Sequence, residues 1–233
     1  MKILALETSG RLGTVGLLEA NDGQVVFSVE RTTPAEERTA RSLLPTVHEL
    51  LKEQNWRPSD IKLVAVTAGP GSFTGLRIGV VAAKTFAYAV GAQVVGVHTL
   101  AALAAPLLPN ASRVWTILDA QRQELFAACF AAGAAIEKQL EPPTDIITID
   151  AWLQQLRSGE VVTGPLLEKL QSQLPAGVVA ASESQWNPSA VAVGRLGLLK
   201  VANGGAISPL ELVPDYFRKS AAEEKADAAN AVQ

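Results

Sequence analysis

The alternation of apolar and polar positions in the first hundred residues predicts three strands followed by alternating helices and strands. Asn21-Asp22-Gly23 separates two strand-length apolar runs, and such an Asp-Gly pair is typical of a hairpin turn. Strands are expected at 2–6, 14–19, 24–30, 62–67 and 93–97, and helices at 38–53, 76–89 and 99–107. Pro45 falls inside the first helical pattern, as an early-turn proline or a kink. A mixed sheet with helices on its faces follows from this order.

The second half of the chain repeats this order more loosely. Strands are expected at 113–118, 124–130, 136–140 and 160–163, and helices at 151–156, 166–173 and 189–202. The last helix is a candidate to pack on the first half. We therefore predict an α/β fold of two ribonuclease-H-like halves, as in the actin, Hsp70 and sugar-kinase superfamily, with the second half reduced. The predicted division is 1–108 and 109–219, with a flexible tail at 220–233.

Composition and charge narrow the class of protein. Hydrophobic residues make up 48% and charged residues 18% of the chain, as in a globular protein. The net charge is -3 and no Lys/Arg cluster is longer than two residues, which disfavours direct nucleic-acid binding by this chain alone. Cys129, the only cysteine, lies in an apolar run and is expected to be an inert thiol. No stretch approaches about 18 apolar residues, so we expect a cytoplasmic protein without membrane contact.

A glycine-rich segment separates a predicted buried strand from the second predicted helix. Its sequence is Gly69-Pro70-Gly71-Ser72-Phe73-Thr74-Gly75. The glycines allow unusual dihedral angles, and Ser72 and Thr74 are both suited to cap the helix. Free N–H groups in such a loop can hold an anion, but a tight capping turn is the favoured interpretation. It is not a Walker motif, because no Gly-Lys-Ser/Thr follows.

Residues 69–79 closely resemble the signature of the TsaB family and, more loosely, that of its catalytic relative TsaD. Agreement with the family continues in order at 2–9, 43–45, 119–124 and 214–218. The resemblance implies the two-halved fold and a role as a non-catalytic subunit that binds and supports TsaD. TsaD transfers a threonylcarbamoyl group to an adenosine beside the anticodon of tRNA.

The resemblance also implies where partners bind. TsaE is expected in the assembled complex, tRNA only indirectly through that complex, and a homodimer is an open alternative on the same surface. The first two long helices and the glycine-rich segment carry the expected TsaD contacts. The candidates are Thr39, Leu43, Val47, Gly69, Pro70, Gly71, Ser72, Phe73, Thr74, Gly75, Arg77, Val80 and Lys84. Whether Arg77 contacts the partner or braces its own loop stays open at this point.

The rival interpretation is an enzyme of the same superfamily, either an ATP-dependent phosphotransferase or a metallopeptidase. TsaD-like enzymes hold a metal with His-x-x-x-His on the first long helix, and residues 38–45 contain no histidine. His48 and His98 are fifty residues apart, so we expect no metal site, no cofactor and no catalytic residue. The late Asn203-Gly204-Gly205 is the only candidate for the adenosine loop of a phosphotransferase.

A vestigial nucleotide site is a further candidate. Glu7 stands at the end of the first strand, where enzymes of this superfamily usually place an aspartate, and Thr8 and Ser9 follow it. The favoured interpretation of these three residues is a polar hairpin turn. Asp119 could join this site, pair with Glu124, or orient the residues between them. The family has arginine at the position of Gln121 and tyrosine at that of Phe126, so this chain departs from the family there.

Overall fold

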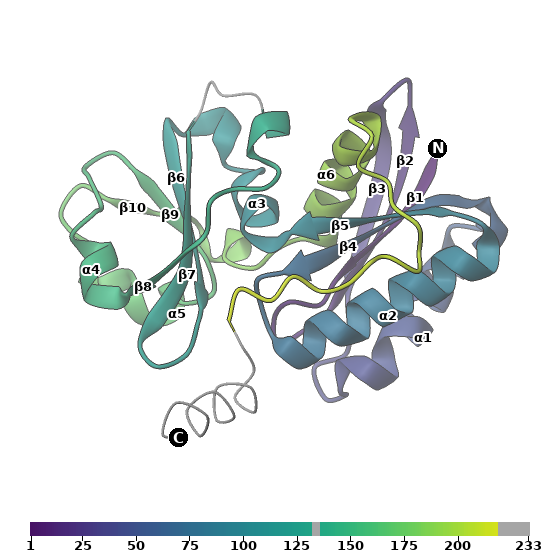
Figure 1. The fold of residues 1–233 in the computed structure, drawn as a ribbon, viewed down its shortest axis with the longest axis horizontal. Helices are drawn as coiled ribbons and strands as arrows, with labels where there is room; N and C mark the ends of the chain where they lie inside the picture. Colours follow the sequence, from purple (N-terminus) through teal and green to yellow (C-terminus); the bar gives the residue numbers. More distant parts are fainter. Residues whose placement is uncertain (132–135, 219–233) are drawn as a thin grey trace, which may run out of the picture.

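Two five-stranded mixed sheets lie side by side in the structure (Figure 1). The structure is a computed structural model that describes residues 1–131 and 136–218. The first sheet has the order β3-β2-β1-β4-β5. Its strands are β1 (Lys2–Glu7), β2 (Thr14–Asn21), β3 (Gln24–Thr32), β4 (Ile61–Gly69) and β5 (Gln93–His98). The first three strands pair antiparallel and the last two join them in parallel. The predicted hairpin turn has Asp22 and Gly23 at φ 48° and 77°, as a type I′ turn requires.

The second sheet repeats the topology of the first. Its order is β10-β9-β6-β7-β8, with β6, β7 and β8 antiparallel and β9 and β10 parallel to β6. Its strands are β6 (Arg113–Asp119), β7 (Glu124–Ala131), β8 (Asp145–Thr148), β9 (Val161–Thr163) and β10 (Val179–Ala180). The predicted α/β fold of two ribonuclease-H-like halves, the second reduced, is confirmed.

Two elements of the second half differ from the prediction. The expected strand at 136–140 is wrong, because a 3₁₀ turn, η3 (Ile136–Gln139), occupies this place and β8 is the third strand instead. The two-residue strand β10 was not predicted, since two residues carry no periodicity. The other 3₁₀ turns are η1 (Pro58–Asp60), η2 (Leu108–Asn110), η4 (Gln171–Gln173) and η5 (Glu183–Gln185).

The long helices of the first half cover one face of its sheet. They are α1 (Thr39–Glu53) and α2 (Phe73–Val90), and their buried side chains form one core with the facing strands. By length and composition α2 could cross a membrane, contrary to the expectation that no stretch approaches a span. One face of α2 instead packs on β4, and the helix contains the charged residues Arg77 and Lys84.

Each half covers part of the other with its last helix. The α3 helix (Thr99–Ala104) follows β5 but packs on β6, whereas α6 (Ala190–Ala202) follows the second sheet and packs on the first (Figure 1). A single hydrophobic cluster therefore runs from the first sheet through both helices to the second sheet. The short helices α4 (Ile149–Leu153) and α5 (Leu167–Leu170) cover the outer face of the second sheet, where Trp152 is fully buried.

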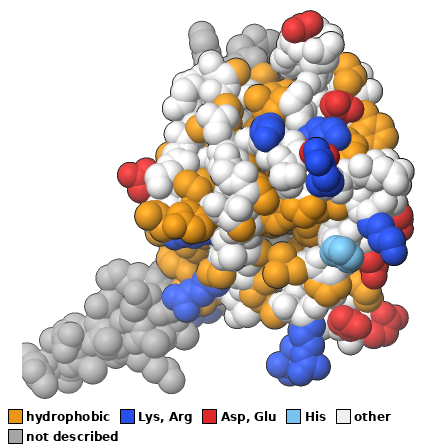
Figure 2. Space-filling model, turned by 90° about the vertical axis from the view of Figure 1, so that its right-hand side faces the viewer, with side chains coloured by type: hydrophobic (Ala, Val, Ile, Leu, Met, Phe, Trp, Pro, Cys, Tyr) orange, Lys and Arg blue, Asp and Glu red, His pale blue; other side chains and the backbone are white. Residues whose placement is uncertain are grey.

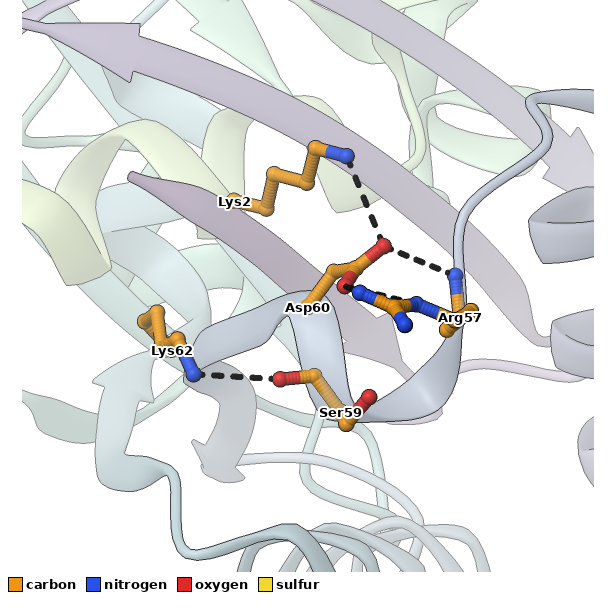
Figure 3. Close-up of polar contacts among 5 residues, drawn as sticks. All are labelled: Lys2, Arg57, Ser59, Asp60 and Lys62. Carbon is orange, nitrogen blue, oxygen red and sulfur yellow. Dashed lines mark hydrogen bonds and ion pairs between the residues drawn. The ribbon is translucent and has the colours of Figure 1, made fainter.

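A polar cluster fixes the edge of the first sheet where β1 and β4 begin (Figure 3). The Arg57 N–H donates to Asp60 Oδ2 over 3.0 Å, and Lys2 Nζ lies 3.7 Å from the same oxygen. The hydrogen bond from Arg57 lowers the pKa of Asp60 below its ordinary value. Lys62 Nζ donates to Ser59 O over 3.1 Å. The carboxyl ends of β1 and β4, together with the glycine-rich segment, lie at the opposite end of these strands.

The chain after α6 forms an extended strap, residues 206–218, that runs beside α2 and crosses toward the second sheet (Figure 1). Ile207 bridges to Val94, Leu212 is buried, and the Asp215 N–H donates to Ala68 O over 2.8 Å. The division between residues 108 and 109 stays a prediction. The predicted tail at 220–233 lies outside the described residues.

Candidate functional site

The glycine-rich segment caps α2, as predicted. Ser72 Oγ accepts the Gly75 N–H over 3.2 Å, so the helix begins at Phe73 and Thr74 lies in its first turn. Gly69 and Gly71 have φ angles of 151° and 156°, which favour glycine. A Cβ on Gly69 would lie 2.2 Å from Asp215 O, and the Ser72 N–H donates to Ser9 O over 2.8 Å. The segment is thus held between the strap and the turn after β1.

The polar turn after β1 belongs to the antiparallel β1–β2 hairpin, as expected, and it is buried, which was not expected. Glu7, Thr8 and Ser9 are almost inaccessible to solvent. The Ser9 N–H donates to Glu7 Oε1 over 2.6 Å, and the Ser9 hydroxyl donates to the same oxygen. Burial raises the pKa of Glu7 to about 7, although the hydrogen bonds from Ser9 oppose this. The buried Glu7 carboxyl group is therefore held by Ser9 and not by water.

Small residues on α2 explain this burial. A Cβ on Gly75 would lie 2.0 Å from Thr8 O, and one on Gly79 would lie 2.1 Å from Thr8 Oγ1. The helix therefore approaches the turn more closely than any larger residue would allow. Thr8 Oγ1 is buried without a hydrogen-bond partner among the described residues. Thr8 thus faces the helix.

A cleft of about 1710 Å³ opens between the two halves at this edge. Glu7 and Ser9 line one wall, and Asp119 and Arg122 line the other. The structure therefore brings Glu7, Ser9 and Asp119 around one cavity, as the vestigial-site hypothesis requires. Asn203-Gly204-Gly205 is absent from the lining of this cleft. The only candidate for an adenosine loop thus lies away from it.

The turn between β6 and β7 forms part of the cleft wall and has an unusual backbone. Gln121, Arg122 and Gln123 have φ angles of 66°, 56° and 62°, in the left-handed region that non-glycine residues rarely adopt. Asp119 Oδ1 accepts the Gln121 N–H over 2.6 Å. Asp119 therefore orients the turn, while Glu124 pairs with Arg218 of the strap. No local signal in the sequence indicated three consecutive left-handed residues.

The histidines and the cysteine have structural surroundings. His98 Nδ1 accepts the Leu100 N–H over 3.2 Å, Nε2 lies 3.1 Å from Thr144 Oγ1, and burial lowers the His98 pKa to about 4. His48 is exposed on α1. Burial raises the pKa of the Cys129 thiol and so favours its protonated form. The neighbouring Arg113 guanidinium acts in the opposite direction. Across residues 1–131 and 136–218, no group of three or more His, Cys, Asp or Glu residues could hold a metal ion.

The predicted partner contacts differ in how accessible they are, and all of them stay predictions. Leu43, Val47 and Val80 are buried against the first sheet, and Gly69, Pro70 and Gly75 are buried as well. The sequence pattern located the amphipathic helices, but the chosen leucine and valines belong to the buried stripe. Thr39 and Gly71 are half-buried, whereas Ser72 and Thr74 are exposed.

The outward face of α1 and α2 carries large apolar side chains that were not among the predicted contacts. Leu44 on α1 is 54% exposed, and Val81 and Tyr88 on α2 are 61% and 73% exposed. Figure 2 shows the right-hand side of the view in Figure 1, where hydrophobic side chains lie between charged ones. Such a concentration of exposed apolar groups is typical of an interaction surface.

Arg77 and Lys84 bind the strap. The Arg77 guanidinium lies 3.9 Å from the centre of the Phe73 ring, and its Nε donates to Tyr216 Oη over 2.8 Å. Lys84 Nζ donates to Leu210 O over 3.1 Å. Arg77 therefore braces its own loop within this chain, and a contact between Arg77 and a partner stays a prediction.

Comparisons with known proteins agree with this architecture. The family model TsaD, described as tRNA N6-adenosine threonylcarbamoyltransferase, matches residues 33–158, just over half of the chain. The tRNA threonylcarbamoyladenosine biosynthesis protein TsaB of Escherichia coli is 30% identical over 97% of this chain and 98% of its own. The protein of the same name from Bacillus subtilis is 29% identical, with 97% of both chains covered.

The solved structures give the same relationship. YeaZ from Pseudomonas aeruginosa superimposes with a TM-score of 0.72 and 25% identity, over 93% of this chain and 99% of YeaZ. Full-length similarity, the family model and the repeated strand order thus agree. The chain belongs to the TsaB family of tRNA threonylcarbamoyladenosine biosynthesis proteins, within the wider group that the TsaD model describes.

Proposed function

We propose that this chain is a non-catalytic subunit that binds a TsaD threonylcarbamoyltransferase and supports its modification of tRNA. The exposed face of α1 and α2, with Leu44, Val81 and Tyr88, is the observation that carries this proposal. Val81 and Tyr88 lie opposite the buried stripe of α2, whereas Leu44 borders the buried stripe of α1. These exposed apolar side chains are available to a partner. TsaE joins the assembly. The tRNA interacts with this chain only indirectly, through the assembled complex.

The surroundings of the cleft support a non-catalytic role. Its strand-end carboxyl group, Glu7, is buried and accepts hydrogen bonds from Ser9. The predicted adenosine loop lies elsewhere, and the histidines take up structural or surface positions. A homodimer through the same helices remains the alternative use of this surface.

The test compares two valines of nearly equal exposure. Val81 on α2 is 61% exposed and Val26 on β3 is 65% exposed. We expect Val81→Glu to weaken binding to TsaD from the same organism about tenfold or more, because a charge replaces an apolar contact at the centre of the surface. Val26→Glu is the matched control and is expected to leave affinity within about twofold.

Affinity is measured by isothermal titration calorimetry, with light scattering for stoichiometry and thermal unfolding for stability. Equal effects of the two substitutions would place the binding surface elsewhere. If the wild-type chain forms no complex with TsaD yet hydrolyses ATP alone, the subunit proposal is wrong and the phosphotransferase returns. A chain that forms only homodimers through α2 would assign this surface to self-association.

A further inference from the structure

Three consecutive side chains of the strap reach different parts of the molecule. Tyr216 contacts the first turn of α2, Phe217 packs at the junction of the halves, and Arg218 binds the turn between β6 and β7. Adjacent residues of an extended chain point in different directions, so one short segment bridges the two halves. These contacts are internal to the chain and independent of any ligand.

The Tyr216 contacts hold the end of α2. Its ring stacks on Phe73 with a centroid distance of 4.6 Å and an interplanar angle of 28°, and its hydroxyl accepts the hydrogen bond from Arg77. Arg77 in turn covers the other aromatic partner of this stack, Phe73. The three side chains form one cluster of aromatic and cation–π contacts at the start of the proposed docking helix.

Phe217 keeps the strap from sliding. Its ring meets His98 edge-on at 5.2 Å and Phe126 at 6.3 Å. His98 is itself fixed by hydrogen bonds to Leu100 and Thr144, and Phe126 lies on β7. Phe217 therefore holds the middle of the segment against both halves, and Tyr216 and Arg218 belong to one ordered stretch of backbone.

Arg218 holds a strained element. Its guanidinium donates to Ala120 O and pairs with the Glu124 carboxylate, on either side of the left-handed residues Gln121 to Gln123. Left-handed backbone is costly for residues other than glycine, so such a turn persists only when its surroundings hold it. The turn lines the cleft.

We propose that Tyr216 and Arg218 are positioning residues that couple the docking end of α2 to the β6–β7 turn at the cleft. The contacts at α2 and the contacts at the β6–β7 turn order the same five residues, Pro214 to Arg218. Fixing the segment at one of these two places therefore restricts it at the other. The functional meaning of this coupling rests on the proposed function: binding of TsaD to α2 then orders a cleft wall that the partner need not touch. The coupling itself belongs to the free chain.

Hydrogen exchange of the full chain, followed by mass spectrometry, tests the coupling without a partner. Tyr216→Phe removes the hydroxyl but keeps the stacked ring. We expect about fivefold faster exchange in residues 73–77, the factor for loss of one hydrogen bond, and faster exchange in residues 119–124 as well. Arg218→Gln is expected to accelerate both segments in the same way. Tyr88→Phe removes a hydroxyl from an exposed tyrosine of α2 and should change neither segment.

The exchange rate in the segment farther from each substitution decides whether the two ends are coupled. If each substitution accelerates exchange only beside itself, both residues are local anchors and the inference is wrong. Arg218→Lys, which keeps the charge, replaces Arg218→Gln if the latter fails to fold. In a second arm, TsaD should slow exchange at 119–124 in the wild-type chain and not in Tyr216→Phe. Binding of TsaD without protection at 119–124 overturns the coupling, whereas no binding at all overturns the proposed function and leaves the first arm decisive.

Discussion

The two halves of this molecule share one strand order and differ in what covers their outer faces. The first sheet is covered by helices of 15 and 18 residues, and the second by helices of 5 and 4 residues. A helix of four or five turns has enough surface to pack on a sheet and still present a second apolar face to solvent. A helix of a single turn does not have enough surface for both. The comparison teaches that one strand order can carry different outer surfaces, and the proposed partner surface lies on the half with the long helices.

The halves are nevertheless one folding unit, because each lends its last helix to the other. Gly197 of α6 lies where a Cβ would approach Ala65 Cβ to 2.5 Å, on the first sheet. We expect Gly197→Val to lower the free energy of unfolding by at least about 3 kcal/mol through overpacking. Both halves should lose stability in one transition. Ala202→Val, at the exposed end of the same helix, is the control and should cost about 0.5 kcal/mol.

Urea unfolding followed by fluorescence and by circular dichroism measures this effect. Two separate transitions in Gly197→Val, with the second half unchanged, would show that the halves fold independently and that the shared core is not essential.

The ends of the equivalent strands β1 and β6 differ in burial, and this predicts a difference in pH dependence. Burial raises the pKa of Glu7 from 4.5 to about 7, so the folded state binds a proton more tightly than the unfolded chain does. The stabilisation from this proton is complete below pH 4.5 and is lost as pH rises to about 7. We expect the wild type to lose about 3 kcal/mol of stability relative to Glu7→Gln across this window.

Urea midpoints of the wild type and of Glu7→Gln between pH 4.5 and 8 measure this difference in stability. If the curves of stability against pH for the wild type and for Glu7→Gln are parallel, Glu7 stays charged across this pH range and its site is open to water.

The second half fills its outer core with tryptophans, and two of them should respond differently to the same substitution. Trp115 Nε1 donates to the buried Glu160 over 2.9 Å, whereas Trp152 Nε1 is buried without a partner among the described residues. Trp115→Phe removes a hydrogen bond to a carboxylate and should cost about 1–2 kcal/mol more than Trp152→Phe. In Trp152→Phe, removal of the unsatisfied N–H offsets the lost packing. Thermal unfolding of both variants checks this, and a larger loss in Trp152→Phe would indicate that its N–H has a partner.

Local sequence patterns predicted most elements of the first half because its strands and helices are long. The period-2 and period-3.6 patterns located both long helices, and Asp22-Gly23 fixed the hairpin. The second half was less predictable, since its elements contain two to five residues in several places. The strand expected at 136–140 is wrong, and β8 supplies the strand that pairs with β7. Of the residues of α2 that were first assigned to a partner, Val80 is buried, whereas Thr74 and Arg77 are exposed.

The sequence by itself determined the fold class, the capping turn at Ser72 and the family, because these depend on periodicity and on motifs of adjacent residues. Only the tertiary structure decided the burial of Glu7, the left-handed turn at 121–123 and the contacts of Arg77, Tyr216 and Arg218. The physical reason is distance along the chain. Arg77 and Tyr216 are separated by 139 positions, and no local preference indicates that they meet. Glycines at 75 and 79 allow the close packing that buries Thr8, but their purpose becomes visible only when the helix lies on the turn.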